Sequence, residues 1–254
     1  MTMSYRWACA VLALVAAACG GETAGELISI EVALRSEPAE SDALASFETD
    51  TGYSVELDEA SVRVGPILAF SPEARAEAPR SILRLVSDAL VPVAQAHGGV
   101  DLVSGRLVRA EWLEPVTLDA LDGETVVLGE VQAEAGAVDA VTLELAREGA
   151  EGAQLELRGE AARDGQTLAF SGELILDDNP LARRIELVHE DFALTEGGRL
   201  TIVVHPDVWL RDAELARAPV DAEGMAQLAP DNQPGRALEI GARSPAAYSI
   251  EWRP

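Results

Sequence analysis

Two histidines and an aspartate in the C-terminal half have the side chains and the spacing of a metal site. The turn Glu196-Gly197-Gly198 separates two runs in which apolar and polar residues alternate, a pattern typical of a β-hairpin. If the runs pair across this turn, His189 stands directly opposite His205, and Asp191 lies diagonal to His205 on the same face. Cβ atoms of opposite strand residues are about 4.5–5.5 Å apart, within reach of one ion. Two imidazoles and a carboxylate could hold zinc, copper or iron.

The alternative is that both histidines share a solvated face and bind nothing, and we favour it. No cofactor is then expected, and zinc or copper at His189, His205 and Asp191 is the second hypothesis. The proposed register places Glu190 on the apolar face beside Val204, which does not fit it. The apolar residues before Val188 also change parity, which predicts a β-bulge in this run.

No other motif in the chain matches a known catalytic pattern. Gly-x-Ser-x-Gly, His-Glu-x-x-His and a glycine-rich phosphate loop are all absent. Every basic residue is arginine, so the sequence excludes Schiff-base chemistry, phosphate-loop lysines and serine–lysine hydrolases. Paired carboxylates for glycoside hydrolysis remain open, because their separation is spatial and an acidic chain offers many. A hydrolase acting on a glycan or an ester is therefore the third hypothesis.

The chain is strongly acidic. It contains 44 Asp and Glu against 19 Arg, with a formal net charge of −25. This charge argues against binding nucleic acid, which requires cationic side chains to neutralise phosphates. It also argues against docking of the protein surface on anionic lipid. Carboxylates keep a protein soluble and separate from its neighbours; binding of cations or of a basic partner is the sharper alternative.

The first residues have the pattern of an export signal. Arg6 precedes an apolar run, Trp7 to Ala18, which is shorter than the roughly 20 residues of a spanning helix. The small residues 16–18 stand directly before Cys19. This stretch resembles the lipobox of bacterial lipoproteins, although Ala16 stands where that family usually has Leu. The resemblance implies cleavage before Cys19 and acylation of its sulfur; ordinary cleavage leaving a free thiol is the alternative.

The leader defines the expected organisation of the chain. Residues 1–18 are the signal peptide, 19–25 are the acylated cysteine and a flexible tether, and 26–254 form a single β-rich domain. Cys9 is lost with the leader, so no disulfide is available to that domain. Gly20 follows the cysteine where Asp would favour retention in the inner membrane. By resemblance to other lipoproteins, we expect an envelope protein anchored by its lipid, at the outer membrane.

A second resemblance involves His97. The stretch Ala94-Gln95-Ala96-His97-Gly98-Gly99, with residues 47–70 before it, is similar to a group of exported lipoproteins of high-GC Gram-negative bacteria. Members of that group tend to carry Ala-His-Ala-His-Pro-Gly. This chain has Gln95 in place of the first histidine and Gly98 in place of the proline. The resemblance implies export and anchoring, but no activity.

The remaining pattern predicts strands, with one helix over residues 79–96 and a short one over 207–216. Alternating runs lie at 27–34, 53–57, 62–70, 107–113, 125–131 and 248–252. Asp164-Gly165 between two such runs is a strong hairpin signal. Pairing across it places Leu155 opposite Leu174 and Glu156 opposite Glu173, and residues 141–145 are expected to add a third strand to a meander. The fold class is therefore all-β and mainly antiparallel, a β-sandwich or open barrel with one or two short helices.

These observations favour a non-enzymatic, membrane-anchored domain that binds or scaffolds a protein or small ligand at the cell envelope. The membrane is contacted through the lipid on Cys19. The second hypothesis is a metal-binding lipoprotein using His189 and His205.

Overall fold

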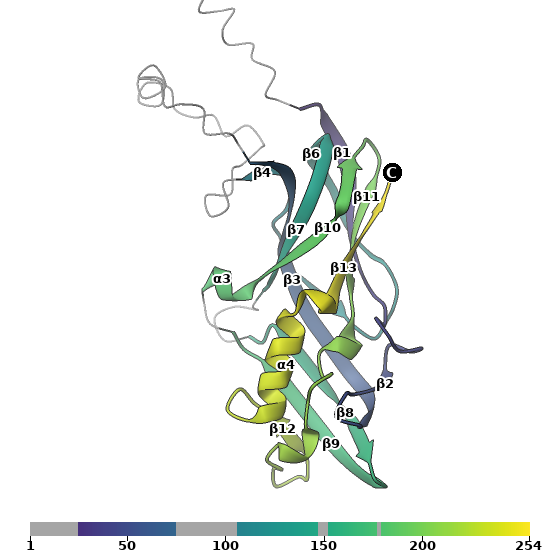
Figure 1. The fold of residues 1–254 in the computed structure, drawn as a ribbon, viewed down its shortest axis with the longest axis vertical. Helices are drawn as coiled ribbons and strands as arrows, with labels where there is room; N and C mark the ends of the chain where they lie inside the picture. The colour runs from purple at the N-terminus through teal and green to yellow at the C-terminus, as the bar shows by residue number, and fades with distance from the viewer. Residues whose placement is uncertain (1–24, 75–105, 147–151, 177–178) are drawn as a thin grey trace, which may run out of the picture.

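The computed structural model describes residues 25–74, 106–146, 152–176 and 179–254. It confirms an all-β fold, built on a 13-stranded sheet that is mainly antiparallel. The strands are β1 (Leu27–Ser36), β2 (Ser46–Glu48), β3 (Ser54–Ala74), β4 (Arg106–Trp112), β5 (Val116–Asp119), β6 (Val126–Glu134), β7 (Gly136–Leu145), β8 (Leu155–Arg163), β9 (Gln166–Leu174), β10 (Arg184–Leu194), β11 (Arg199–Val204), β12 (Ala226–Leu228) and β13 (Tyr248–Arg253). The helices are α3 (Pro180–Arg183) and α4 (Gln233–Arg243), with 3₁₀ turns η1 (Pro206–Val208), η2 (Leu215–Arg217) and η3 (Pro245–Ala247) (Figure 1).

Strand β3 connects the two halves of the molecule. It is 21 residues long, and each of its edges pairs with several strands in succession. One edge pairs with β2, β5 and then β4, and the other pairs with β8 and then β7. The sequence predicts two strands here, with an edge or bulge at Gly65-Pro66. The register against β7 does shift between Val64 and Ile67, but the backbone continues as one strand.

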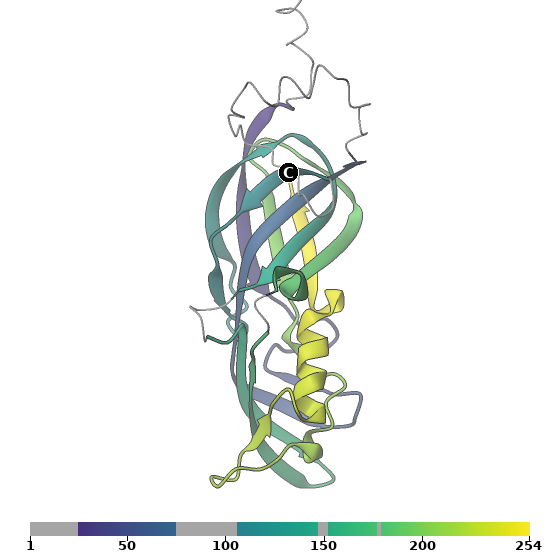
Figure 2. The ribbon, with the colours of Figure 1, turned by 90° about the vertical axis from the view of Figure 1, so that its left-hand side faces the viewer.

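The upper half is an open barrel, formed by β10, β7, the second half of β3, β4, β6, β1, β11 and β13 (Figures 1 and 2). Strands β1 and β11 are parallel, and the other pairs in this half are antiparallel. In the described part of the chain, no hydrogen-bonded ladder joins β10 to β13. Phe192 and Trp252 stack across this seam with ring centroids 5.7 Å apart.

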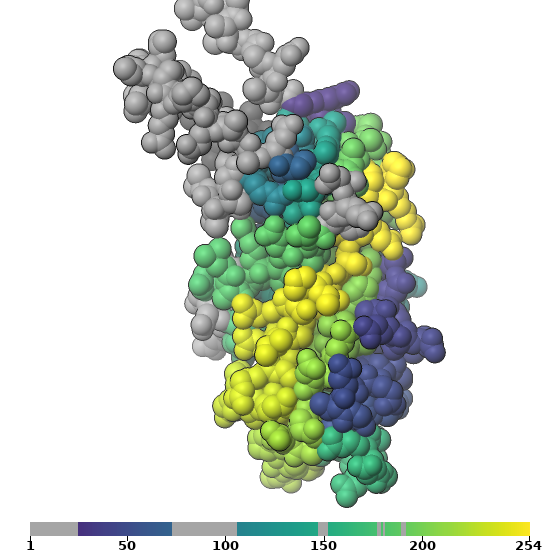
Figure 3. Space-filling model, viewed as in Figure 1, coloured from purple at the N-terminus to yellow at the C-terminus, as the bar shows by residue number. Residues whose placement is uncertain are grey.

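The lower half is a sheet that we call the lower sheet: β2 and β5, the first half of β3, β8, β9 and β12. Helix α4 and the segment that follows β11 pack against one side of it. Figure 2 shows α4 on that side, and Figure 3 shows the same residues covering the lower half in the view of Figure 1. Buried apolar residues of the sheet, such as Phe170, point toward these elements, so the other side of the sheet is the polar one.

The hairpin at Asp164-Gly165 has the predicted register, with Leu155 opposite Leu174 and Glu156 opposite Glu173. Asp164 and Gly165 both have positive φ, as the two-residue turn requires. The predicted meander with residues 141–145 is wrong. Strand β7 pairs with β3 and β10, and it follows β8 along the same edge of β3 without pairing with the hairpin.

Helix α4 has no counterpart in the predicted elements. Asn232 caps it by accepting a hydrogen bond from the Gly235 amide at 2.9 Å, and Pro234 sits in the first turn, where no amide is needed. Leu238 and Ala242 are buried on its inner face. The short helix predicted over 207–216 is instead the two 3₁₀ turns η1 and η2. The helix predicted over 79–96 lies outside the described residues.

Among the described helices, none is long and apolar enough to cross a membrane.

Candidate functional site

The structure does not bring His189 and His205 together as a strand pair. Strand β10, which contains His189 and Asp191, pairs with β7. Strand β11 instead lies between β1 and β13. The predicted pairing across the Glu196-Gly197-Gly198 turn is therefore wrong, and with it the geometric basis of the metal site. The turn itself forms, but the two strands diverge from it.

The bulge predicted before Val188 lies directly after it. Val188 pairs with Ala140 and Phe192 with Val138, so three β10 residues, 189–191, face the single residue Asp139. The side chains of residues 189–191 are outside the described part of the chain.

Both ring nitrogens of His205 have partners. Nδ1 lies 2.7 Å from the Glu37 carbonyl oxygen, and Nε2 lies 3.0 Å from Ser249 Oγ. A carbonyl can only accept, so Nδ1 carries the hydrogen and Nε2 is the acceptor in the neutral ring. A metal could reach Nε2 only by displacing Ser249. Among the described residues, no group of three His, Cys, Asp or Glu side chains is arranged to hold a metal ion.

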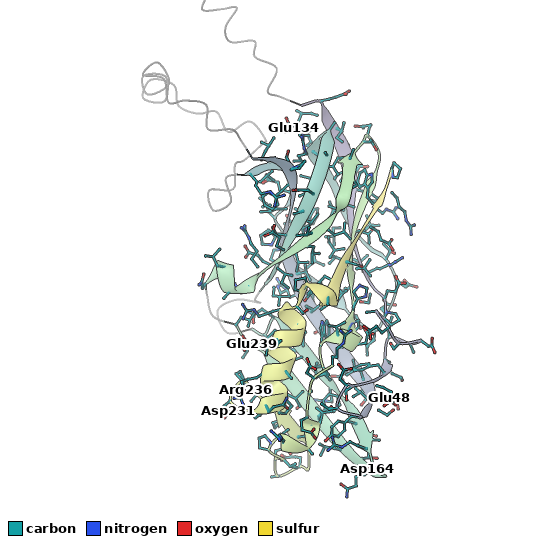
Figure 4. All side chains as sticks on the ribbon, in the orientation of Figure 1. Glu48, Glu134, Asp164, Asp231, Arg236 and Glu239 are labelled. Atoms are coloured by element: carbon teal, nitrogen blue, oxygen red, sulfur yellow. The ribbon has the colours of Figure 1, made fainter. Side chains whose placement is uncertain are left out.

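Two further predicted sites, Cys19 and His97, lie outside the described residues. The nearest described positions are at one end of the barrel. Ala74 pairs with Arg106, and Gly25 donates its amide hydrogen to the Glu134 side chain. The first described residues therefore lie at the end of the barrel marked by Glu134 in Figure 4, whereas the hairpin tip at Asp164 is at the opposite end of the long axis.

The polar side of the lower sheet carries a dense set of carboxylates, which we call the acidic sheet face. Strand alternation and register place these side chains on one surface, because directly paired residues point to the same side of a sheet. Two arginines, Arg63 and Arg158, share the surface. The carboxylates are all exposed: Glu48, Glu56, Asp58, Glu59, Asp119, Glu156, Glu160 and Glu173.

Two pairs of like charges face each other directly on this surface. Glu56 on β3 is opposite Glu160 on β8, and Glu156 on β8 is opposite Glu173 on β9. Like charges in direct cross-strand register destabilise a sheet. Arg158 stands opposite Glu59, so it balances only part of this charge. The face is therefore arranged with a local excess of negative charge.

A hollow of about 600 Å³ lies within the acidic sheet face. Asp58, Glu59 and Asp119 are at one side of it, and Glu156 and Glu173 are at the other. The hollow spans β3, β5, β8 and β9 and is lined by: Asp58, Glu59, Ala60, Ser61, Thr117, Asp119, Leu121, Glu156, Leu157, Arg158, Ser171, Gly172 and Glu173. It is an open depression in which carboxylates outnumber the single arginine, which suits cationic side chains.

In a second cluster, around Glu214, the charged and polar side chains bind one another. Glu214 accepts hydrogen bonds from Arg163 at 2.8 Å and from the Tyr53 hydroxyl at 2.9 Å, and the Arg163 guanidinium lies 4.0 Å from the Tyr53 ring centroid. The hydrogen bond from Arg163 lowers the pKa of Glu214, and burial raises the pKa of Tyr53. The Tyr53 hydroxyl also accepts from the Ala216 amide. These contacts tie the hairpin tip to the segment after β11, so the cluster is structural.

Sequence reasoning found one of the two like-charge pairs and missed the other. Glu156 and Glu173 are separated by a hairpin, so their register follows from the turn. The pairing of Glu56 with Glu160 depends on β3 lying beside β8, and nothing local in the sequence specifies that neighbour. Apart from the Glu156–Glu173 pair, the sequence indicated the acidic sheet face only through the net negative charge of the chain.

No protein-family model and no curated protein matches the chain. One solved structure, MbnP from Methylosinus trichosporium, is similar over 90% of this chain and 99% of that chain, with 11% sequence identity and a TM-score of 0.36. At this level of similarity, functional inference rests on the residues of this chain alone.

Proposed function

We propose that the protein is a lipid-anchored binding protein of the cell envelope, and that its acidic sheet face binds a basic polypeptide segment. The observation that carries this proposal is the register that sets Glu56 against Glu160 and Glu156 against Glu173 around an open hollow. These pairs cost stability in the free protein. A cationic partner would offset this repulsion. The repulsion that destabilises the free protein would therefore favour the complex.

The chemistry of the face favours arginine- or lysine-rich segments over small apolar ligands. The hollow is lined by five carboxylates and is open to solvent, so it does not enclose a small apolar molecule as a ligand pocket does. An extended basic chain could place successive side chains between the carboxylates of β3, β8 and β9.

The anchor is proposed from the sequence. Acylation of Cys19 would tether the chain through residues 20–25, about 20 Å at full extension. The tether meets the barrel near Glu134, so the acidic sheet face belongs to the half of the molecule that is remote from the anchor (Figure 4). A face in that position would be available to partners away from the bilayer. We propose that the protein is located at the outer membrane. Mass spectrometry of the mature N-terminus tests the anchor, and an unmodified Cys19 would contradict it.

Binding is tested by titrating a fluorescent oligoarginine peptide into the purified protein at low and at high salt. Saturable binding that weakens steeply with salt supports the proposal, because exposed charges are screened beyond about 10 Å at 0.1 M salt. An oligoglutamate peptide of equal length is the control and should not bind. Absence of saturable oligoarginine binding at low salt would refute the proposed function.

A further inference from the structure

His205 and Ser249 form a hydrogen-bonded pair in which the donor and the acceptor can be assigned. The Nδ1 hydrogen is held by the Glu37 carbonyl oxygen at 2.7 Å, so Nε2 is the free base of the neutral ring. Nε2 lies 3.0 Å from Ser249 Oγ, which therefore donates its hydrogen to the imidazole. A hydroxyl bonded to a base that a third group orients is the arrangement of an activated nucleophile. Both side chains are partly exposed.

Each member of this arrangement is fixed by secondary structure. The His205 amide donates to the Ala247 carbonyl at 2.8 Å, which continues the β11–β13 ladder to the histidine. Ser249 lies within β13, opposite Val203. The Glu37 amide donates to the Val204 carbonyl at 2.9 Å, which sets the position of the Glu37 carbonyl. Ser249 is thus on a strand, and His205 and Glu37, each one residue past the end of a strand, are held by backbone hydrogen bonds.

We propose that Ser249 is a nucleophile toward acyl esters, with His205 as its general base and the Glu37 carbonyl as the group that positions the imidazole. This proposal is independent of the acidic sheet face, since no residue that lines the hollow takes part in it. An ester is the substrate class because an uncharged carbonyl stabilises an imidazolium less than a carboxylate does. The pair is thus matched to alkoxide leaving groups and not to amines.

The reaction proceeds in two balanced steps. Ser249 Oγ bonds to the acyl carbon as its proton passes to His205 Nε2; the ester C–O bond then breaks, and the alkoxide leaves with that proton as an alcohol. Water next attacks the acyl-serine and gives a proton to Nε2. The bond to Oγ breaks, Oγ recovers the proton, and the carboxylic acid is released. No oxidant, reductant or metal is required.

A fluorophosphonate probe tests the proposal, because it phosphonylates nucleophilic serines. Ser29 is the matched control, since it lies on strand β1, is also partly exposed, and its Oγ bonds to the Glu130 carboxylate in place of a histidine. Intact mass and peptide mapping of the full chain should show one adduct, on Ser249. Ser249→Ala should remove it, Ser29→Ala should leave it unchanged, and His205→Gln should slow labelling by about 100-fold.

Hydrolysis of 4-nitrophenyl acetate provides a second readout and should follow the same order among the variants. Imidazole in solution should restore labelling to His205→Ala, because it replaces the missing base. If His205→Ala does not fold, judged by circular dichroism, the comparison of Ser249 with Ser29 in the unaltered protein still tests the proposal. Equal labelling of the two serines, or of the protein with and without Ser249, would overturn the proposal.

Discussion

Glu156 and Glu173 stand directly opposite each other on β8 and β9, with both carboxylates exposed on the acidic sheet face. The hairpin cannot avoid this contact by slipping, because a shift of one residue would move Leu155, Leu157 and Leu174 out of the core. The apolar face fixes the register, and the register imposes the repulsion. The charge pair is therefore a consequence of the fold that only a change of residue can remove.

Neutralising one member of this pair should stabilise the protein. Glu156→Gln removes the repulsion and keeps the side-chain shape, so we expect the free energy of unfolding to rise by about 0.2–1 kcal/mol at low salt. Urea denaturation measures it, and high salt should shrink the gain. Glu239→Gln is the matched control. It breaks the 3.0 Å ion pair with Arg243 on α4 and should lower stability slightly. A loss of stability in Glu156→Gln would contradict the prediction.

The cluster around Glu214 predicts a specific pH dependence. The Arg163 hydrogen bond, and then that of Tyr53, lower the pKa of Glu214 below its ordinary 4.5. A carboxyl with a depressed folded-state pKa contributes stability above its ordinary pKa and loses it as the pH falls through the lowered value. Glu214→Gln should therefore destabilise the protein at neutral pH, and the difference should shrink as the pH falls below 4.5 and vanish below the lowered pKa. Thermal melts from neutral to acidic pH check this; a difference that persists in acid would contradict it.

Asp207 should hold the segment between β1 and β2. Its buried carboxylate accepts the amide hydrogens of Ala39, Glu40 and Ser41 at 3.0–3.4 Å. Asp207→Ala leaves these amides without an acceptor, and we expect a loss of about 1–3 kcal/mol. Hydrogen exchange should show faster exchange at residues 39–41.

The control for this prediction is Asp212→Ala, since the Asp212 side chain is exposed and near in sequence. It should change neither the stability nor the exchange of residues 39–41. Unchanged protection of these amides in Asp207→Ala would show that the segment is held by other contacts.

Gly241 should be required for the packing of α4. A Cβ added there would overlap the carbonyl groups of Trp209 and Val208, and both of these residues are buried. Gly241→Ala should therefore lower the free energy of unfolding by about 1–3 kcal/mol, although alanine favours a helix. The exposed neighbour Ile240 provides the control, because Ile240→Ala should stay within about 0.5 kcal/mol of the unaltered protein. A stabilised Gly241→Ala would show that α4 can shift.

How far the sequence predicted this fold is clearest in the two hairpins. The β8–β9 register is right because Asp164-Gly165 fixes a two-residue turn and both strands have a strictly apolar face. The β10–β11 pairing is wrong, although its turn exists, because alternation shows which face is buried and not which strand is the neighbour. Strand β11 pairs instead with β1, which is distant in sequence.

The same reason explains what was missed elsewhere. Helix α4 begins Gln233-Pro234-Gly235, and proline and glycine suggest a turn; Asn232 as the cap, with Pro234 in the first turn, is the signal that could have revealed it. The His205–Ser249 pair depends on the β11–β13 ladder, and the acidic sheet face depends on β3 lying beside β8. Each requires long-range pairing that no local pattern specifies.

The most direct test of the acidic sheet face is the affinity of an oligoarginine peptide for two double variants with the same net charge. Glu156→Gln with Glu173→Gln removes two of the five carboxylates that line the hollow, and Asp231→Asn with Glu239→Gln neutralises residues beside and on α4, across the sheet (Figure 4). We expect the first to weaken binding by about 3- to 10-fold and the second to leave it unchanged. Equal weakening in both would show that the peptide senses only the total charge of the protein, and the acidic sheet face would not be its binding site.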